Sequence, residues 1–77
     1  MEKDLIEYIA KSLVSDPESV RVEENQNEKG RVLELHVAQY DIGKVIGRHG
    51  RIAKAIRTVL NAAIAGSGNR AILEIMD

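Results

Sequence analysis

Hydrophobic residues at helical spacing mark the beginning of the chain. In residues 1–14 they recur at intervals of one, three and four positions, so they form one stripe on a helix. The stripe consists of Leu5, Ile6, Ile9 and Leu13. Residues 15–18 (SDPE) end this helix, because the residue before a proline is displaced from helical geometry. The sequence therefore predicts an amphipathic helix over residues 1–14.

Alternation of apolar and polar residues predicts three strands. It runs over residues 19–24 and again over residues 31–38, separated by the polar segment 25–30 (NQNEKG), which favours an antiparallel hairpin with a loop at 25–30. A third alternating segment covers residues 71–76. The faces expected to point inward carry Val20, Val22, Leu33, Leu35, Val37, Ala71, Leu73 and Ile75.

Between the second and third strands the period becomes helical. Asp41 is suited to cap a helix N-terminus, and apolar residues at positions 42, 45 and 46 predict two short helical turns. Residues 47–50 (GRHG) interrupt the helix, residues 51–65 resume it with a long apolar stripe, and residues 66–69 (GSGN) stop it. The order is helix, strand, strand, short helix, long helix, strand. We expect an α+β fold in which residues 1–77 form a single domain.

Length and composition restrict the class of protein. At 77 residues the chain has room for one small domain, and 44% hydrophobic with 30% charged residues is typical of a folded globular protein. No apolar run approaches the roughly 20 residues of a membrane helix, and acids near the start argue against a signal peptide. The absence of cysteine excludes disulfides and cysteine-ligated zinc. We expect a cytoplasmic protein without membrane association.

Charge is divided unevenly along the chain. The net charge is only −1, yet residues 1–41 carry a net −5, whereas residues 42–73 hold six basic residues and no acid. These basic residues are Lys44, Arg48, Arg51, Lys54, Arg57 and Arg70. Such a concentration favours a face that binds polyanions. With Tyr8 and Tyr40 as the only aromatic residues, base stacking of the kind used by RRM and OB-fold proteins is not expected.

The motif with the clearest chemistry is GxxG at residues 47–50, within the segment 42–52 (IGKVIGRHGRI). Glycines lack Cβ, so a turn between two helices can bring backbone N–H groups close to a phosphate. The start of the next helix adds unpaired N–H groups and a positive dipole end, while Arg48 and Arg51 add charged donors. An apolar floor for bases is expected beside the loop, formed by Ile42, Val45 and Ile46.

These residues resemble a known family. The segment 41–57 (DIGKVIGRHGRIAKAIR) is similar to KH domains of the type II order, α-β-β-α-α-β, and a likeness to the small single-domain bacterial KH proteins of the KhpA family covers nearly the whole chain. The resemblance implies a three-stranded mixed sheet with three helices on one face, RNA binding, and no catalysis. It also implies a homodimer, or pairing with a larger KH-containing protein of the Jag type (KhpB). Composition and periodicity do not address that pairing.

The family motif is carried over residue by residue. It places its fixed glycines at Gly47 and Gly50, with Arg48 and His49 between them; His49 departs from the commoner Lys or Gln and introduces pH sensitivity. We expect the protein to hold short single-stranded RNA with low sequence selectivity, as a KH loop clamps about four nucleotides. The expected RNA-binding residues are Ile42, Gly43, Lys44, Val45, Ile46, Gly47, Arg48, His49, Gly50, Arg51 and Lys54.

Other functions find less support. An enzyme is not expected, because no serine or threonine has a histidine in a recognisable context. Neither a metal nor a cofactor is expected, since His36 and His49 lie thirteen residues apart without a carboxylate cluster at ligand spacing. The alternative that stays open is a protein-interaction module, because the long helix has a broad stripe with small residues that permits close approach of a second subunit. The two functions are compatible, as dimerisation would add avidity.

Overall fold

A three-stranded mixed sheet organises the fold. The computed structural model describes residues 2–28, 30–66 and 70–77. Strand β1 (Arg21–Asn27) pairs antiparallel with β2 (Gly30–His36), and β2 pairs in parallel with β3 (Ala71–Met76), so that β2 is the central strand. Parallel neighbours need a crossover connection, and helices between β2 and β3 provide it.

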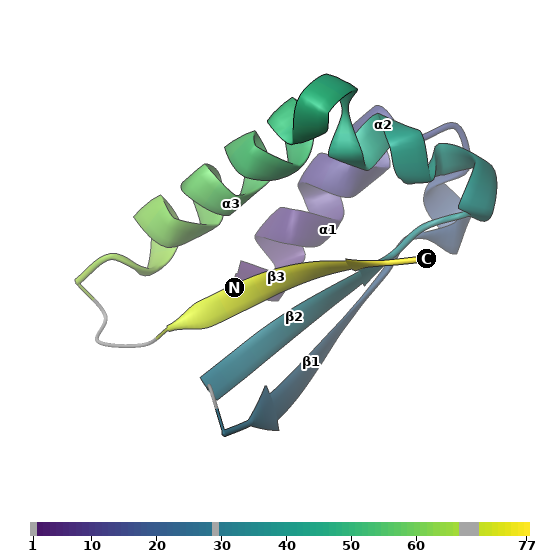
Figure 1. The fold of residues 1–77 in the computed structure, drawn as a ribbon. Helices are drawn as coiled ribbons and strands as arrows, with labels where there is room; N and C mark the ends of the chain where they lie inside the picture. The colour runs from purple at the N-terminus through teal and green to yellow at the C-terminus, as the bar shows by residue number, and fades with distance from the viewer. Residues whose placement is uncertain (1, 29, 67–69) are drawn as a thin grey trace.

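Three α-helices lie on one face of this sheet (Figure 1). Helix α1 (Glu2–Leu13) precedes β1, whereas α2 (Ile42–Ile46) and α3 (Arg51–Ile64) form the crossover. Three short 3₁₀ turns complete the described elements: η1 (Pro17–Ser19), η2 (Gln39–Asp41) and η3 (Arg48–Gly50). The predicted α+β class, the order of elements and the placement of three helices on one face are confirmed.

The hydrophobic core fills the space between the helices and the sheet. The alternation predicted for the strands is confirmed at six of the eight positions expected to face inward, which are buried. Val37 and Ile75 are only partly buried against the core, and Val37 lies just beyond the end of β2. Helices α1 and α3 cover them with residues from their predicted stripes, and each fully buried aliphatic side chain contributes roughly 1.5–3 kcal/mol. The cluster contains Ile6, Ala10, Val20, Val22, Leu33, Leu35, Val45, Ile56, Leu60, Ile64, Ala71 and Leu73.

The hairpin is tighter than the sequence predicts. Residues 25–27 were expected in a loop, but they belong to β1 and pair with residues 30–32 of β2. Their side chains are exposed at the edge strand of the sheet, so polar character is compatible with strand pairing. Only residues 28 and 29 separate the two strands. The predicted loop at 25–30 is therefore wrong in its extent.

The end of α3 agrees with the prediction as far as the structure describes it. The helix ends at Ile64, and Gly66 has a φ of 84°, the left-handed backbone that glycine accepts without a steric cost. Residues 67–69 of the predicted stop signal lie outside the described residues, as do residues 1 and 29.

Arg31 joins three elements at the far end of the sheet from the GxxG loop. Its guanidinium donates to Glu2 on α1 at 2.8 Å and to Glu24 on β1 at 3.1 Å. The bonds to Arg31 lower the pKa of Glu2. This group holds the beginning of α1 against the β1–β2 hairpin.

Candidate nucleic-acid interface

The GxxG loop has a backbone that glycine alone accommodates at its first position. Gly47 ends α2 by donating its N–H to the carbonyl of Gly43 at 2.9 Å, and it has a φ of 77° and a ψ of 172°. That combination is essentially confined to glycine. A Cβ on Gly47 would lie 2.6 Å from Cγ1 of Ile52, so space as well as geometry excludes a side chain.

The second half of the loop has left-handed backbone geometry. His49 has a φ of 59° and Gly50 a φ of 73°, so η3 is a tight turn and not a continuous helix. Gly50 donates its N–H to the carbonyl of Gly47 at 3.1 Å. The N–H groups of Arg48 and His49 have no backbone acceptor in the described part of the chain. Two donors therefore remain for a ligand such as phosphate.

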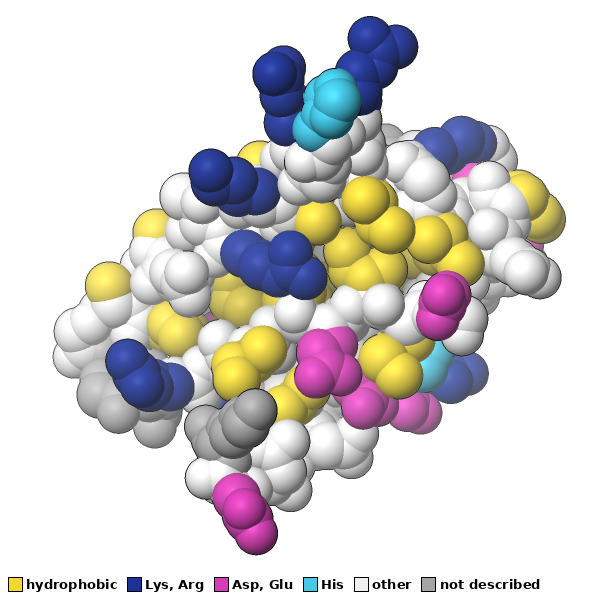
Figure 2. All heavy atoms as spheres, in the orientation of Figure 1, with side chains coloured by type: hydrophobic (Ala, Val, Ile, Leu, Met, Phe, Trp, Pro, Cys, Tyr) yellow, Lys and Arg dark blue, Asp and Glu magenta, His cyan; other side chains and the backbone are white. Residues whose placement is uncertain are grey.

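Basic side chains surround this turn. Arg48 and His49 are exposed on the loop, Arg51 is exposed at the first position of α3, and Lys54 follows one turn later. Among the described residues none of these four has an ion-pair partner. Figure 2 shows Lys and Arg side chains with a histidine at the projecting end of the molecule, and more basic side chains below them beside a hydrophobic area. The loop is a compact, uncompensated cationic surface.

Lys44 differs from the other cations of this region. Its Nζ lies 3.0 Å from Oδ1 of Asp41 and also donates to the hydroxyl of Ser15. The charge of Lys44 is thus already paired inside the chain. The expectation that Lys44 neutralises a phosphate has less support than the same expectation for Arg48 or Arg51.

The sequence predicts that the side chain of Asp41 caps α2, but in the structure it makes no capping hydrogen bond. The side chain is fully buried, and its two oxygens accept the backbone N–H groups of Ser15 at 3.1 Å and Asp16 at 3.0 Å. Burial alone would raise the pKa of Asp41, but the hydrogen bonds from Ser15, Lys44 and Asp16 offset burial and lower it. Asp41 therefore fastens the start of α2 to the turn that follows α1.

The expected apolar floor is only partly accessible. Ile46 is 38% exposed and Ile42 is half-buried, but Val45 is fully buried in the core. The predicted contact between Val45 and a base is therefore not available in this structure, because the side chain supports α2 from below. The spacing of three and four residues is the same for core and groove positions, so sequence alone could not separate them.

Arg57 extends the basic surface toward the edge of the sheet. Its Nε and Nη2 atoms both lie 3.4 Å from the carbonyl oxygen of Leu73 on β3, so the side chain bridges α3 and the edge strand. A hollow of about 190 Å³ lies at this place, lined by Arg57, Leu60, Asn61, Ala71, Ile72 and Leu73. The cationic surface thus continues from the GxxG loop along α3 toward β3.

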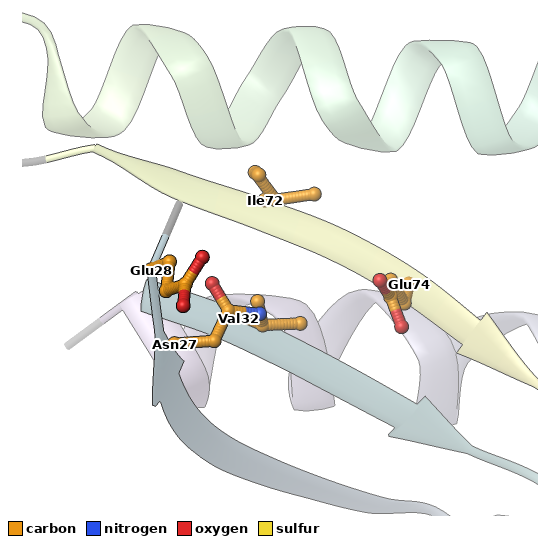
Figure 3. A pocket seen from close by; sticks show the side chains of 5 residues that line it. All are labelled: Asn27, Glu28, Val32, Ile72 and Glu74. Carbon is orange, nitrogen blue, oxygen red and sulfur yellow. The ribbon is translucent and has the colours of Figure 1, made fainter. Parts of the chain in front are cut away.

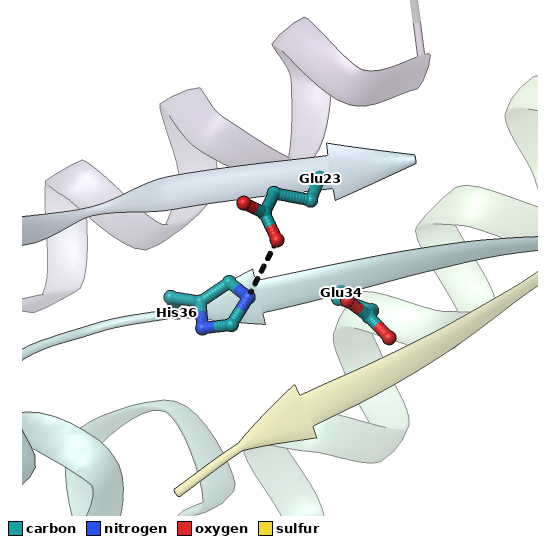
Figure 4. A group of neighbouring side chains, drawn as sticks. All are labelled: Glu23, Glu34 and His36. Carbon is teal, nitrogen blue, oxygen red and sulfur yellow. Dashed lines mark ion pairs between the residues drawn. The ribbon is translucent and has the colours of Figure 1, made fainter. Parts of the chain in front are cut away.

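The helix-free face of the sheet holds a cluster that the sequence analysis missed. Figure 4 shows Glu23, Glu34 and His36 together on β1 and β2, and their potential ligand atoms lie within 4.8 Å of one another. Nε2 of His36 is 3.4 Å from Oε2 of Glu23 and makes no hydrogen bond within the described residues. The prediction that neither histidine has a carboxylate cluster at ligand spacing is therefore wrong for His36. The cluster forms because Glu23 on β1 lies opposite Glu34 on β2, and this pairing follows from the register of the two strands, which the sequence does not specify.

No helix in the described ranges has the length and apolar character needed to cross a bilayer.

Comparison with known proteins defines the family. The model of the KhpA/KhpB KH domain matches residues 3–75. A protein of Clostridium acetobutylicum named RNA-binding protein KhpA is 54% identical over 74 residues, covering 96% of this chain and 99% of that protein. The proteins of the same name from Borreliella burgdorferi and Aquifex aeolicus are 51% and 48% identical, over 99% and 97% of this chain and 93% and 95% of their own lengths.

No significant match was found among solved structures. The family is one of RNA-binding KH proteins and not of enzymes, in agreement with the sequence prediction. The family model covers nearly all of the chain, and the relatives share about half of its residues. The chain therefore belongs to the KhpA/KhpB family of KH domains.

Proposed function

We propose that this protein binds short single-stranded RNA with low sequence selectivity, through the GxxG loop and the surface beside it. The single observation that carries the proposal is the loop itself. Its first glycine has a backbone restricted to glycine, and the exposed cations beside it have no ion pairs among the described residues. Relatives that share about half of the sequence are named RNA-binding proteins, which supports the same ligand for this chain.

The binding mode follows from the positions of these groups. The RNA backbone lies against Gly47–Gly50, where free N–H groups and Arg48 meet one phosphate, and Arg51 and Lys54 each meet a further one. Gly43 lets the backbone approach α2, since a Cβ there has no neighbour within 4 Å. Bases then contact Ile42 and Ile46 and the edge of β3.

Low selectivity and modest affinity follow from what the surface offers. Stacking on aromatic rings contributes about 1–3 kcal/mol per base in other single-strand binders. The two tyrosines lie outside the GxxG loop, Tyr8 on α1 and Tyr40 on η2, and the hydroxyl of Tyr40 donates to Asp16 at 3.2 Å. The proposed mode therefore includes no stacking of bases on aromatic rings. Phosphate contacts carry no sequence information, so several RNAs compete on similar terms.

A dimer would compensate for a weak single site. Helices α1 and α3 share an apolar hollow of about 400 Å³, lined by Ile9, Leu13, Arg51, Ile52, Ala55, Ile56 and Val59. Leu13 and Val59 are 39% and 43% exposed there. We place the contact with a second copy, or with a larger KH protein of the Jag type (KhpB), on this surface. Two loops in one particle then raise the effective affinity for RNA, as a cytoplasmic post-transcriptional regulator requires.

The loop is tested by the double substitution Arg48→Asp/His49→Asp, with RNA binding measured by fluorescence anisotropy on a labelled mixed-sequence decanucleotide. Both side chains are exposed, so the fold is retained and the affinity falls by roughly 30-fold or more. The matched control is Lys3→Asp/Gln26→Asp on α1 and β1, which makes the same change in charge at exposed positions away from the loop. An equal loss in both variants would refute a local site.

The interaction module is the second candidate, and the apolar hollow favours it. Val59→Glu is expected to convert a dimer to a monomer in light scattering, whereas Thr58→Glu, on the neighbouring exposed position, is not. If the Arg48→Asp/His49→Asp variant binds RNA as well as the unchanged protein while Val59→Glu abolishes the dimer, the module without RNA binding is the correct function.

A further inference from the structure

Three glutamates form a row across the helix-free face of the sheet. In the strand register Glu23 on β1 lies opposite Glu34 on β2, and Glu34 lies opposite Glu74 on β3. Neighbouring strands are about 4.8 Å apart, so the row is about 10 Å long and runs perpendicular to the strands. Like charges directly opposite each other in a sheet are destabilising. The acidic row therefore weakens the free protein.

Cations within the chain relieve only one end of this row. Glu23 has the guanidinium of Arg21 at 3.2 Å and the ring of His36 at 3.4 Å, which carries a charge only when protonated, whereas Glu34 and Glu74 have no ion pair among the described residues. Several basic residues nevertheless lack an ion pair in the described part of the chain, and most of them lie on α3 and the GxxG loop, away from this face. A destabilising group of charges that stays unrelieved is typical of a functional surface.

An apolar patch adjoins the acidic row. Figure 3 shows Val32 and Ile72 side by side on β2 and β3, with Glu74 at one end and Asn27 and Glu28 at the other. These five residues line a shallow hollow of about 560 Å³. Ile72 is 42% exposed, an unusual position for a large aliphatic residue on a sheet. Val32 itself is only 4% exposed, so Ile72 supplies the accessible aliphatic surface, two residues from the charge of Glu74 on β3.

We propose that this face docks a cationic segment of a protein partner, with lysine or arginine side chains on the glutamate row and an aliphatic side chain on Ile72. Charge complementarity identifies the occupant. A row of carboxylates repels RNA phosphates, and its length suits two or three basic residues of one segment. The proposal goes beyond RNA binding, because the helices and the GxxG loop lie on the other side of the sheet (Figure 1).

The test uses the full chain and a defined probe. The probe is a blocked dodecapeptide with four arginines and two leucines among serines and glycines, and the control peptide has glutamate in place of each arginine. Amide-shift titration is expected to locate the arginine peptide on β1, β2 and β3, with the same shifts when RNA saturates the loop. The glutamate peptide is expected to leave these strands unshifted.

Two double variants distinguish the effect of the glutamate row on peptide binding from the effect of the overall negative charge of the protein. Glu34→Gln/Glu74→Gln is expected to weaken the peptide roughly tenfold and to raise the Tm by a few degrees, because like-charge repulsion is removed. The control Asp4→Asn/Glu18→Gln removes two exposed acids elsewhere and is expected to change the affinity by less than twofold. Equal weakening in both variants, a lower Tm in the first, or shifts confined to the GxxG loop would each overturn the docking site.

Discussion

The GxxG edge and the open face of the sheet have opposite charge, but each gathers several like charges that lack an ion pair among the described residues. Elsewhere several acids and bases pair within the chain, for example Arg31 with Glu2 and Glu24, and Lys44 with Asp41. Among the described residues, the loop cations Arg48 and Arg51 have no ion pair, and neither do Glu34 and Glu74 on the sheet. Arg31 joins two elements to β2 through its ion pairs, whereas these two groups of like charge are left for a ligand of opposite charge to neutralise.

The two surfaces also differ in what shapes them. The loop depends on its glycines for its backbone geometry, so substitution of Gly47 changes that geometry. The acidic row depends on the side chains of exposed or half-buried strand positions, so substitutions there change charge and leave the backbone intact. Experiments on stability therefore separate the two surfaces as clearly as experiments on binding.

The largest effect on stability is expected for Gly47→Ala. The new Cβ meets Ile52 at 2.6 Å, in backbone geometry that only glycine adopts, and the expected loss is about 2–5 kcal/mol. Gly43→Ala is the matched control, because a Cβ there has free space inside α2 and should add about 0.5–1 kcal/mol. Urea denaturation measures both. Similar values for the two variants would show that the loop does not require its first glycine.

A smaller loss is expected for Asp41→Asn. The amide cannot accept both backbone N–H groups as the carboxylate does, and Lys44 loses its charged partner. The Tm should fall by roughly 5–15 °C in circular dichroism. Glu34→Gln serves as the control, since it also removes one acid but should not lower the Tm. An unchanged Tm in Asp41→Asn would show that the buried carboxylate is not needed to hold α2.

The same carboxylate predicts an acid dependence. The pKa of Asp41 is lower in the folded protein than in the unfolded chain, so its contribution is complete above the ordinary aspartate pKa of about 3.9. That contribution is lost as the pH falls through the lowered folded pKa. Denaturation between pH 5 and 2 should therefore show a steeper decline for the unchanged protein than for Asp41→Asn. Parallel curves would contradict the assignment.

The smallest effect concerns salt. With about three phosphate contacts, the logarithm of RNA affinity should fall with the logarithm of salt concentration with a slope of about −2. Arg51→Ala should reduce this slope by about 0.7, whereas Lys44→Ala should leave it unchanged, because Lys44 is paired with Asp41. Equal reductions would place Lys44 among the phosphate contacts and remove the distinction between paired and unpaired cations.

Local patterns predicted the elements well, because their physics is local. The period of apolar residues identified all three helices and the inward faces of the strands. Tertiary pairing overrode the polar residues 25–27, which join β1 although they resemble a loop. The backbone hydrogen bonds that β2 provides are invisible in the sequence of β1 alone.

Features that depend on distant contacts were beyond the sequence. Asp41 has the residue type and the position of an N-cap, yet its partners are Ser15 and Asp16, more than twenty positions away. Val45 has groove spacing but lies in the core. The meeting of Glu23 and Glu34 depends on the strand register. The family resemblance predicted the position of the GxxG loop. The burial and the ion pairs of the side chains around it are known only from the folded chain.

The contact between Arg57 and the carbonyl of Leu73 also affects how readily molecules of this protein associate through their sheet edges. β3 is an edge strand, and free edge carbonyls are templates on which a strand of another molecule can add. The guanidinium covers one of them with a charged group that repels its counterpart on a second molecule. Arg57 is therefore expected to oppose the edge-to-edge association of free molecules at high concentration.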